Sequence, residues 1–115
     1  AVSSKLVAVA DALRAADADT LVVTALDEVA WLLNVRGGDI AFCPVSYAYA
    51  LVSRDRAPQG ADEGPASVSW FVDEGKASAE VVAALRASAA PSKVSVLPYA
   101  GITAAVRAEV AAGRR

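Results

Sequence analysis

The sequence predicts an α/β domain in which a mixed β-sheet carries helices on both faces. Two observations lead to this fold class. First, segments whose apolar residues recur at helical spacing alternate with short runs rich in valine and aromatic residues. Second, the predicted order is helix, strand, helix, strand, strand, helix, strand, helix. The two consecutive strands predict a hairpin, and the intervening helices predict crossovers, so parallel and antiparallel neighbours occur together.

The first half of the chain predicts two helices and a strand. Ser3 or Ser4 caps the first helix, which ends near Ala16 and buries one apolar stripe. The stripe consists of Leu6, Val9, Ala10 and Leu13. Residues 21–23 are continuously apolar, which is typical of a strand buried on both faces. Thr24 precedes Asp27 by three residues, and this spacing resembles a capping box that begins a second helix.

The second helix is expected to pack through Val29, Leu32 and Leu33. Trp31 flanks this face, and we expect it in the core rather than stacked on a ligand. Gly37 and Gly38 then allow positive φ angles where the helix ends.

The second half begins with two strands, at residues 47–53 and 68–72, which form a hairpin. The loop between them, residues 54–66, is rich in Pro, Gly and charge. A third helix runs from a cap at Ser78 to about residue 89, a fourth strand covers residues 94–97, and a last helix covers 102–112 before Gly113. Their expected inward residues are Val81, Val82, Leu85, Ile102, Val106 and Val110.

Composition excludes several classes of function. The 115 residues fit one domain, and the net charge of −2 comes without any basic stripe, so we expect no nucleic-acid partner. No apolar run approaches the roughly 20 residues that cross a bilayer. The single cysteine, Cys43, excludes an internal disulfide and favours a reducing, cytoplasmic location. The absence of histidine removes Ser-His and Cys-His nucleophiles and the usual zinc sites.

Residues 25–39 carry the most specific motif, Ala-Leu-Asp-Glu-Val-Ala-Trp-Leu-Leu-Asn-Val-Arg-Gly-Gly-Asp. This segment resembles the Ala-Leu-Asp-Glu-Ile-Ala-Trp-Leu-x-Asn-x-Arg-Gly-Ser-Asp segment of Xaa-Pro aminopeptidases. Shorter matches follow at Pro44, Val45, Tyr49, Ala50, at residues 70–73, and at Val96, Pro98 and Tyr99. The sequence departs from the family pattern at Gly38, Cys43 and Ser46, where Ser, Asn and Phe are usual.

The resemblance implies that residues 1–115 are a creatinase-like N-terminal domain with a ribonuclease H-like motif, the second of two in a three-domain enzyme. It implies a non-catalytic domain that flanks the metal site, limits substrate access and supports dimerisation. The parent enzyme would remove an N-terminal residue that precedes proline, using two divalent metal ions, often manganese, in its C-terminal domain. No catalytic residue, metal ligand or cofactor is expected in this chain.

The same resemblance implies three partners, which are the C-terminal catalytic domain of the parent protein, a second subunit, and a peptide substrate at the cleft. The chain contains no Met, which agrees with a domain excised from a longer protein and also with a processed mature one. The alternative function is a stand-alone α/β module that binds a partner or a small ligand. A downstream set of Asp, Asp, His, Glu and Glu in the parent gene would decide for the peptidase.

The candidate site is the loop Arg36, Gly37, Gly38 and Asp39, as a substrate-side or interdomain loop. Arg36 either faces the catalytic cleft or pairs with Asp39 or with helix carbonyls and orders the loop. Asp39 has the same two interpretations. The glycines either cap the helix or allow a ligand or another chain to approach closely.

Three residues near this loop are expected to be structural. Cys43 has no neighbouring histidine and is expected to be an inert thiol. Tyr47 and Tyr49 fall on one strand face and are expected to pack.

Overall fold

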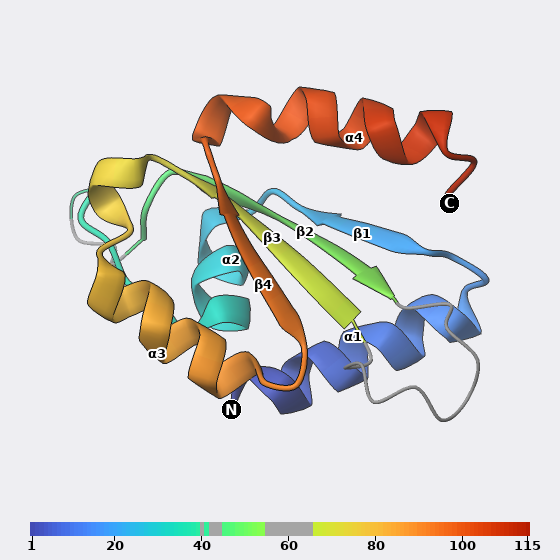
Figure 1. Cartoon of the computed structure of the whole chain (residues 1–115), viewed down its shortest axis with the longest axis horizontal. Coiled ribbons are helices and arrows are strands. Elements are labelled where there is room, and N and C mark those ends of the chain that lie inside the picture. Colours follow the sequence, from blue (N-terminus) through green and yellow to red (C-terminus); the bar gives the residue numbers. More distant parts are fainter. Residues whose placement is uncertain (40, 42–44, 55–65) are drawn as a thin grey trace.

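A computed structural model describes residues 1–39, 41, 45–54 and 66–115 of the chain. Within these residues the protein is a four-stranded sheet with helices on two sides (Figure 1). The helices are α1 (Val2–Ala15), α2 (Leu26–Leu33), α3 (Ala79–Ala89) and α4 (Ile102–Ala111). The strands are β1 (Thr20–Val23), β2 (Ala48–Arg54), β3 (Ala66–Val72) and β4 (Lys93–Leu97). Two 3₁₀ turns, η1 (Glu74–Lys76) and η2 (Tyr99–Gly101), complete the order, and the predicted succession of helices and strands is confirmed.

The sheet is mixed, as predicted. Its strand order is β1-β2-β3-β4, with β2 antiparallel to both neighbours and β3 parallel to β4. The predicted hairpin is the β2–β3 pair, in which Ala50 lies opposite Trp70 and Val52 opposite Val68. The expected long loop, apart from its end residues Arg54 and Ala66, lies outside the described residues.

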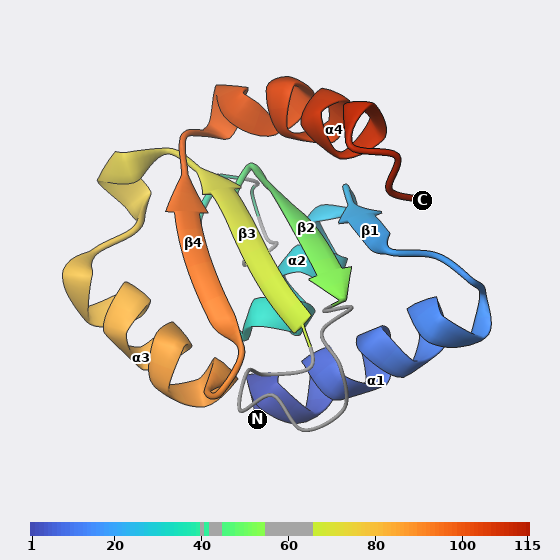
Figure 2. The same cartoon turned by 45° about the vertical axis from the view of Figure 1, so that its right-hand side comes forward.

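Helices cover both faces of the sheet, which confirms the predicted fold class (Figures 1 and 2). Helices α1, α2 and α3 pack on one face and enclose the main core. Because side chains alternate along a strand, Val68 and Trp70 enter this core while Phe71 points to the opposite face. There η2 approaches so closely that a methyl group on Gly101 would lie 3.7 Å from the Phe71 ring. Helix α4 follows η2 and lies over this second face.

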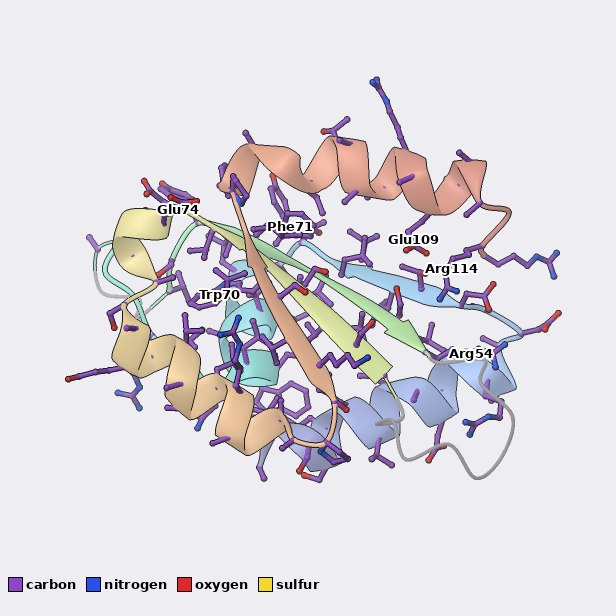
Figure 3. The ribbon with its side chains drawn as sticks, viewed as in Figure 1. Arg54, Trp70, Phe71, Glu74, Glu109 and Arg114 are labelled. Carbon is purple, nitrogen blue, oxygen red and sulfur yellow. The ribbon has the colours of Figure 1, made fainter. Side chains whose placement is uncertain are left out.

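The end of the chain closes onto the beginning of β1. The Arg115 carbonyl accepts hydrogen bonds from the backbone N–H groups of Asp19 and Thr20. The Arg115 N–H in turn donates to the Asp19 carboxylate at 3.0 Å. Above it, Glu109 of α4 accepts from the Thr20 hydroxyl at 2.8 Å and from Arg114 at 2.6 Å. Figure 3 shows Glu109, Arg114 and Arg54 grouped at this end of the sheet.

The prediction that residues 21–23 are buried on both faces is wrong. Leu21 and Val22 are each 39% exposed, because β1 lies at the edge of the sheet and, among the described strands, pairs with β2 alone. A short apolar run does not distinguish an edge strand from a central one, since both bury part of their side chains.

Two of the predicted helix caps are also wrong. Helix α1 already begins at Val2, so Ser3 and Ser4 lie inside its first turn, and Ala1 is the N-cap residue. Helix α2 begins after Ala25 without a side-chain cap, and Thr24 lies one residue too early to provide one. The predicted Ser78 cap is confirmed, since its hydroxyl accepts from the Val81 N–H at 3.3 Å.

Trp31 was predicted in the core, and this prediction is wrong. Its side chain is 63% exposed on the outer surface of α2, where the Lys5 ammonium lies 4.6 Å from the ring centroid. Val81 of α3 and Val110 of α4 are likewise exposed rather than inward. Trp31 and Val81 lie beside the buried residues of their helices, where helical spacing alone does not separate the inner face from its margin, and α4 has no fully buried residue.

The end of α2 differs from the prediction. Asn34 adopts the left-handed conformation with φ of 54°, and neither Gly37 nor Gly38 has a positive φ. The predicted end of the last helix before Gly113 is confirmed, and Gly113 adopts a positive φ of 73°. None of the helices that the structure describes has the length and apolarity required to cross a lipid bilayer.

Candidate functional site

The Arg-Gly-Gly-Asp loop leaves α2 through Asn34. The left-handed turn at Asn34 ends the helix, and the Val35 N–H then bonds back to the Ala30 carbonyl at 3.1 Å. Short polar residues such as asparagine adopt this conformation more readily than others.

Asp39 anchors the far end of the loop. Its backbone N–H donates to the Val45 carbonyl at 3.1 Å. Its carboxylate accepts from the Tyr47 N–H and from the Lys76 ammonium, both at 2.7 Å. The Lys76 hydrogen bond, followed by that from Tyr47, holds the pKa of the Asp39 carboxyl below its ordinary value of 3.8. The loop is therefore tied to the start of β2 and to η1 by one ionised side chain.

Gly37 lies against Ser46. A β-carbon built on Gly37 would fall 1.7 Å from the Ser46 hydroxyl oxygen and 2.9 Å from its backbone nitrogen. No other side chain fits at this position without displacing the backbone. Gly38 meets nothing within 4 Å and faces open space. The close approach of Ser46 therefore explains why residue 37 is glycine. No such contact requires glycine at residue 38.

Arg36 is exposed at the middle of the loop. Within the described part of the chain its guanidinium forms no hydrogen bond or ion pair, and Asp39 binds Lys76 instead. Arg36 lies at the border of a cavity of about 350 Å³ between α2 and α3, where Trp70 of β3 forms part of the lining. Figure 3 shows Trp70 on the side of the sheet that faces these helices. The loop therefore presents a charged side chain whose donors are available to another molecule.

A cluster of three tyrosines lies next to the loop. Tyr49 stacks on Tyr99 with ring centroids 5.2 Å apart and an angle of 13° between the rings. Tyr47 is 49% exposed, and the Lys76 ammonium lies 5.6 Å from its ring centroid. Of the predicted packing pair, Tyr49 packs in this way, whereas Tyr47 is largely on the surface. Lys76 contacts both the loop and the cluster and so joins them.

Sequence reasoning found the loop but missed the residues that hold it. Ser46 and Lys76 come from two different segments, and no local pattern marks them as neighbours of residues 36–39. Cys43, expected to be an inert thiol, lies outside the described residues. Among the residues that the structure describes, no three His, Cys, Asp or Glu side chains gather where they could hold a metal ion.

Known proteins resemble the chain over most of its length. Xaa-Pro aminopeptidase 1 of Dictyostelium discoideum is 35% identical over 100 residues, which cover 87% of this chain and 13% of that protein. Xaa-Pro aminopeptidase ApepP of Drosophila melanogaster is 41% identical over 90 residues, covering 78% of this chain and again 13% of the relative. The chain therefore spans only about one eighth of the curated relatives it matches.

A solved structure agrees in fold. The X-prolyl aminopeptidase of Caenorhabditis elegans, described as a cytosolic enzyme with a di-nuclear active site, superposes with a TM-score of 0.75 and 27% identity. The match covers 99% of this chain and 17% of that one. The family model of the Creatinase/Prolidase N-terminal domain matches residues 1–114. The chain therefore belongs to the Creatinase/Prolidase N-terminal domain family.

Proposed function

We propose that this domain is a non-catalytic part of an Xaa-Pro aminopeptidase and forms one wall of the entrance to its active site. There it would limit access to short peptide ends and support dimerisation of the enzyme. The observation that carries the proposal is the geometry of Arg36, exposed on a loop that Asp39, Lys76 and the Tyr47 N–H hold in place. A guanidinium on a loop whose backbone is fixed in this way can bind a carboxylate or a peptide carbonyl without the entropic cost of ordering the loop.

The chemistry belongs to the rest of the parent protein in this proposal. Two divalent metal ions, with manganese as the proposed metal, would activate the attacking water in the C-terminal domain. The di-nuclear active site and cytosolic location described for the C. elegans enzyme support the metal pair and a cytoplasmic location for this parent. The domain's partners would be that catalytic domain, a second subunit and the peptide.

The test is Arg36→Ala in the full-length parent enzyme. If Arg36 contacts substrate, kcat/KM for an Xaa-Pro peptide should fall about tenfold, which corresponds to about 1.4 kcal/mol of transition-state interaction. The melting temperature should stay unchanged, because Arg36 makes no hydrogen bond within the described residues. Arg86→Ala removes an exposed arginine of α3 and is the matched control.

The same variant separates the proposal from its alternatives. Lower stability with unchanged activity per folded molecule would mean that Arg36 serves only its own loop. A parent gene without a downstream Asp, Asp, His, Glu, Glu set would favour the stand-alone module instead. Sedimentation of the full-length enzyme measures the dimer directly, and a monomer of full activity would contradict that part of the proposal.

A further inference from the structure

The cavity between α2 and α3, which we call the α2–α3 cavity, has an apolar interior. Its volume of about 350 Å³ falls within the range of about 300–1,000 Å³ that small-molecule sites occupy. Four of the side chains that line it come from four different segments, and each is at most 3% exposed: Val2, Leu33, Trp70 and Leu85. An apolar group of a ligand would therefore meet a wall that the fold has already formed.

The indole N–H of Trp70 is an unpaired donor of a residue in this wall. Trp70 lies on β3 between Ala50 of β2 and Val96 of β4, and its side chain is on the face of the sheet that packs against α1, α2 and α3 (Figure 3). Its indole nitrogen is buried, yet it has no hydrogen-bond partner among the residues that the structure describes. Buried polar groups in folded proteins almost always have a partner, because an unpaired one costs free energy. Such a donor beside a cavity indicates a place for an acceptor atom of another molecule.

The charged groups around the α2–α3 cavity are positive. Arg36 and Lys76 lie at its border, and none of the described residues that line it is Asp or Glu. The Lys76 ammonium is paired with Asp39 at 2.7 Å, whereas the Arg36 guanidinium forms no hydrogen bond or ion pair within the described part of the chain. A guanidinium can donate two parallel hydrogen bonds to one carboxylate. The unpaired charge of Arg36 and the unpaired N–H of Trp70 therefore both favour an anionic acceptor.

We propose that the α2–α3 cavity binds a small amphipathic monocarboxylate, an aryl- or alkyl-substituted acid without an amino group. Its apolar body would lie among Val2, Leu33 and Leu85. Its carboxylate would accept hydrogen bonds from the Trp70 N–H and from Arg36, whose side chain is long and exposed. An ammonium group is disfavoured, because no carboxylate in the described lining would pair with it once it left water. The inference goes beyond the proposed function, since the ligand is not a peptide and the site lies within this chain.

The test titrates the ¹⁵N-labelled 115-residue chain with 3-phenylpropanoate and follows the signals of its two indole N–H groups. We expect the Trp70 signal to move downfield and to saturate, because its N–H gains a hydrogen bond to the ligand. The Trp31 signal should stay in place, since that ring lies on the outer surface of α2. Trp31→Phe removes one of the two signals and so assigns them.

Two compounds with the same phenylpropyl skeleton test the two chemical requirements of the ligand. The alcohol 3-phenylpropan-1-ol lacks the negative charge, and phenylalanine adds one ammonium group. Each should bind about tenfold more weakly than 3-phenylpropanoate, the first because it loses the ion pair with Arg36 and the second because its ammonium is unpaired. Equal binding of the alcohol would mean that the cavity recognises only apolar surface. Equal binding of phenylalanine would mean an amino-acid site, and either result would overturn the proposal.

Variants at exposed positions test the two parts of the site. Arg36→Ala should weaken the binding of 3-phenylpropanoate about tenfold and leave that of the alcohol unchanged. Ala84 lines the cavity from an exposed position of α3, so Ala84→Phe should fill the space and abolish the binding of both compounds in a chain whose melting temperature shows that it folds. Arg107→Ala removes an exposed arginine from α4, on the other face of the sheet, and is the matched control (Figure 2).

Three results would contradict the site itself. The first is a Trp70 signal that does not move at the solubility limit of 3-phenylpropanoate, which would leave the indole N–H to a water molecule. The second is binding that survives Ala84→Phe, which would place the ligand elsewhere on the chain. The third is binding of the carboxylate that Arg36→Ala weakens no more than Arg107→Ala does, which would remove the guanidinium from the site.

Discussion

At the scale of single residues, position 37 requires glycine because Ser46 packs against it. Its backbone angles would allow other residues. The Ser46 hydroxyl and backbone nitrogen occupy the space that a β-carbon would need. We expect Gly37→Ala to lower the free energy of unfolding by about 1–3 kcal/mol, because the backbone of one of the two segments must move. Urea unfolding followed by tryptophan fluorescence measures this difference.

Gly38→Ala is the matched control for this substitution. Gly38 faces open space at a φ that other residues adopt, so alanine should leave stability unchanged or raise it by about 0.4–1 kcal/mol through the unfolded chain. Equal losses at both positions would show that the loop needs glycine for a reason other than the Ser46 contact.

Asp39 predicts a pH dependence whose sign follows from its partners. Its folded pKa lies below 3.8 because Lys76 and the Tyr47 N–H bind the charged form. Its contribution to stability is therefore complete well above 3.8 and is lost as the pH falls through the lowered folded value. The difference in unfolding free energy between the natural chain and Asp39→Asn should be constant from about pH 7 to 5 and shrink below about pH 4.

Chemical denaturation at each pH, carried out on both chains, checks this prediction. Because the other carboxyl groups titrate in both chains, only the difference reports on Asp39. A difference that instead grows as the pH falls would mean that the protonated form is the better-bound one, and the assigned ion pair would be wrong.

Single residues also mark where sequence reasoning stops. The motif at residues 25–39 located the candidate loop, because its composition is specific without any knowledge of contacts. Trp31 belongs to the same motif but lies on the surface, since helical spacing fixes the direction of a side chain only to within a margin of the buried stripe. Lys76 is 37 residues away from Asp39, and no local signal brings such residues together.

At the scale of elements, α3 offers the clearest test of a predicted cap. The Ser78 hydroxyl satisfies the Val81 N–H, one of the unpaired donors of the first helical turn. We expect Ser78→Ala to cost about 1 kcal/mol, measured by thermal unfolding. Ser4→Ala in α1 is the control, since Ser4 lies within its helix and bonds only to the Ala1 carbonyl. A loss of the same size at Ser4 would remove the cap as the explanation.

The elements themselves were predictable because their signals are local. Helical periodicity and the runs of strand-forming residues predicted the order and type of the four α-helices and four strands in the described residues, but not the two 3₁₀ turns. The starts of α1 and α2 were misplaced because Ser3, Ser4 and Thr24 satisfy a capping pattern without making a cap. The exposure of β1 could not be read from residues 21–23, because a strand's place in the sheet depends on which segments pair with it.

At the scale of the whole molecule, Asp19 holds the chain end to the sheet. Its carboxylate is 1% exposed, accepts from the Arg115 N–H and lies 3.6 Å from the Arg54 guanidinium. We expect Asp19→Ala to lower the free energy of unfolding by about 3 kcal/mol, because the Arg54 side chain, which is only 14% exposed, then keeps its charge without the Asp19 carboxylate. Thermal unfolding together with amide exchange at α4 measures the effect.

Asp11→Ala is the control for that variant. Asp11 pairs with Arg14 on the exposed face of α1, and such surface pairs contribute little, so its loss should change stability by less than about 0.5 kcal/mol. If Asp19→Ala lowered the free energy of unfolding as little as Asp11→Ala, the contact between Arg115 and the start of β1 would contribute nothing measurable to stability.

The closure at Asp19 also bears on how the protein is made. Asp19 and its partner Arg115 are 96 residues apart, so a ribosome adding about 10 residues per second supplies the second roughly ten seconds after the first. During that interval the backbone N–H groups of Asp19 and Thr20 lack the Arg115 carbonyl that accepts their hydrogen bonds in the folded domain. This contact between Arg115 and the start of β1 therefore forms on the ribosome only after residue 115 has left the exit tunnel.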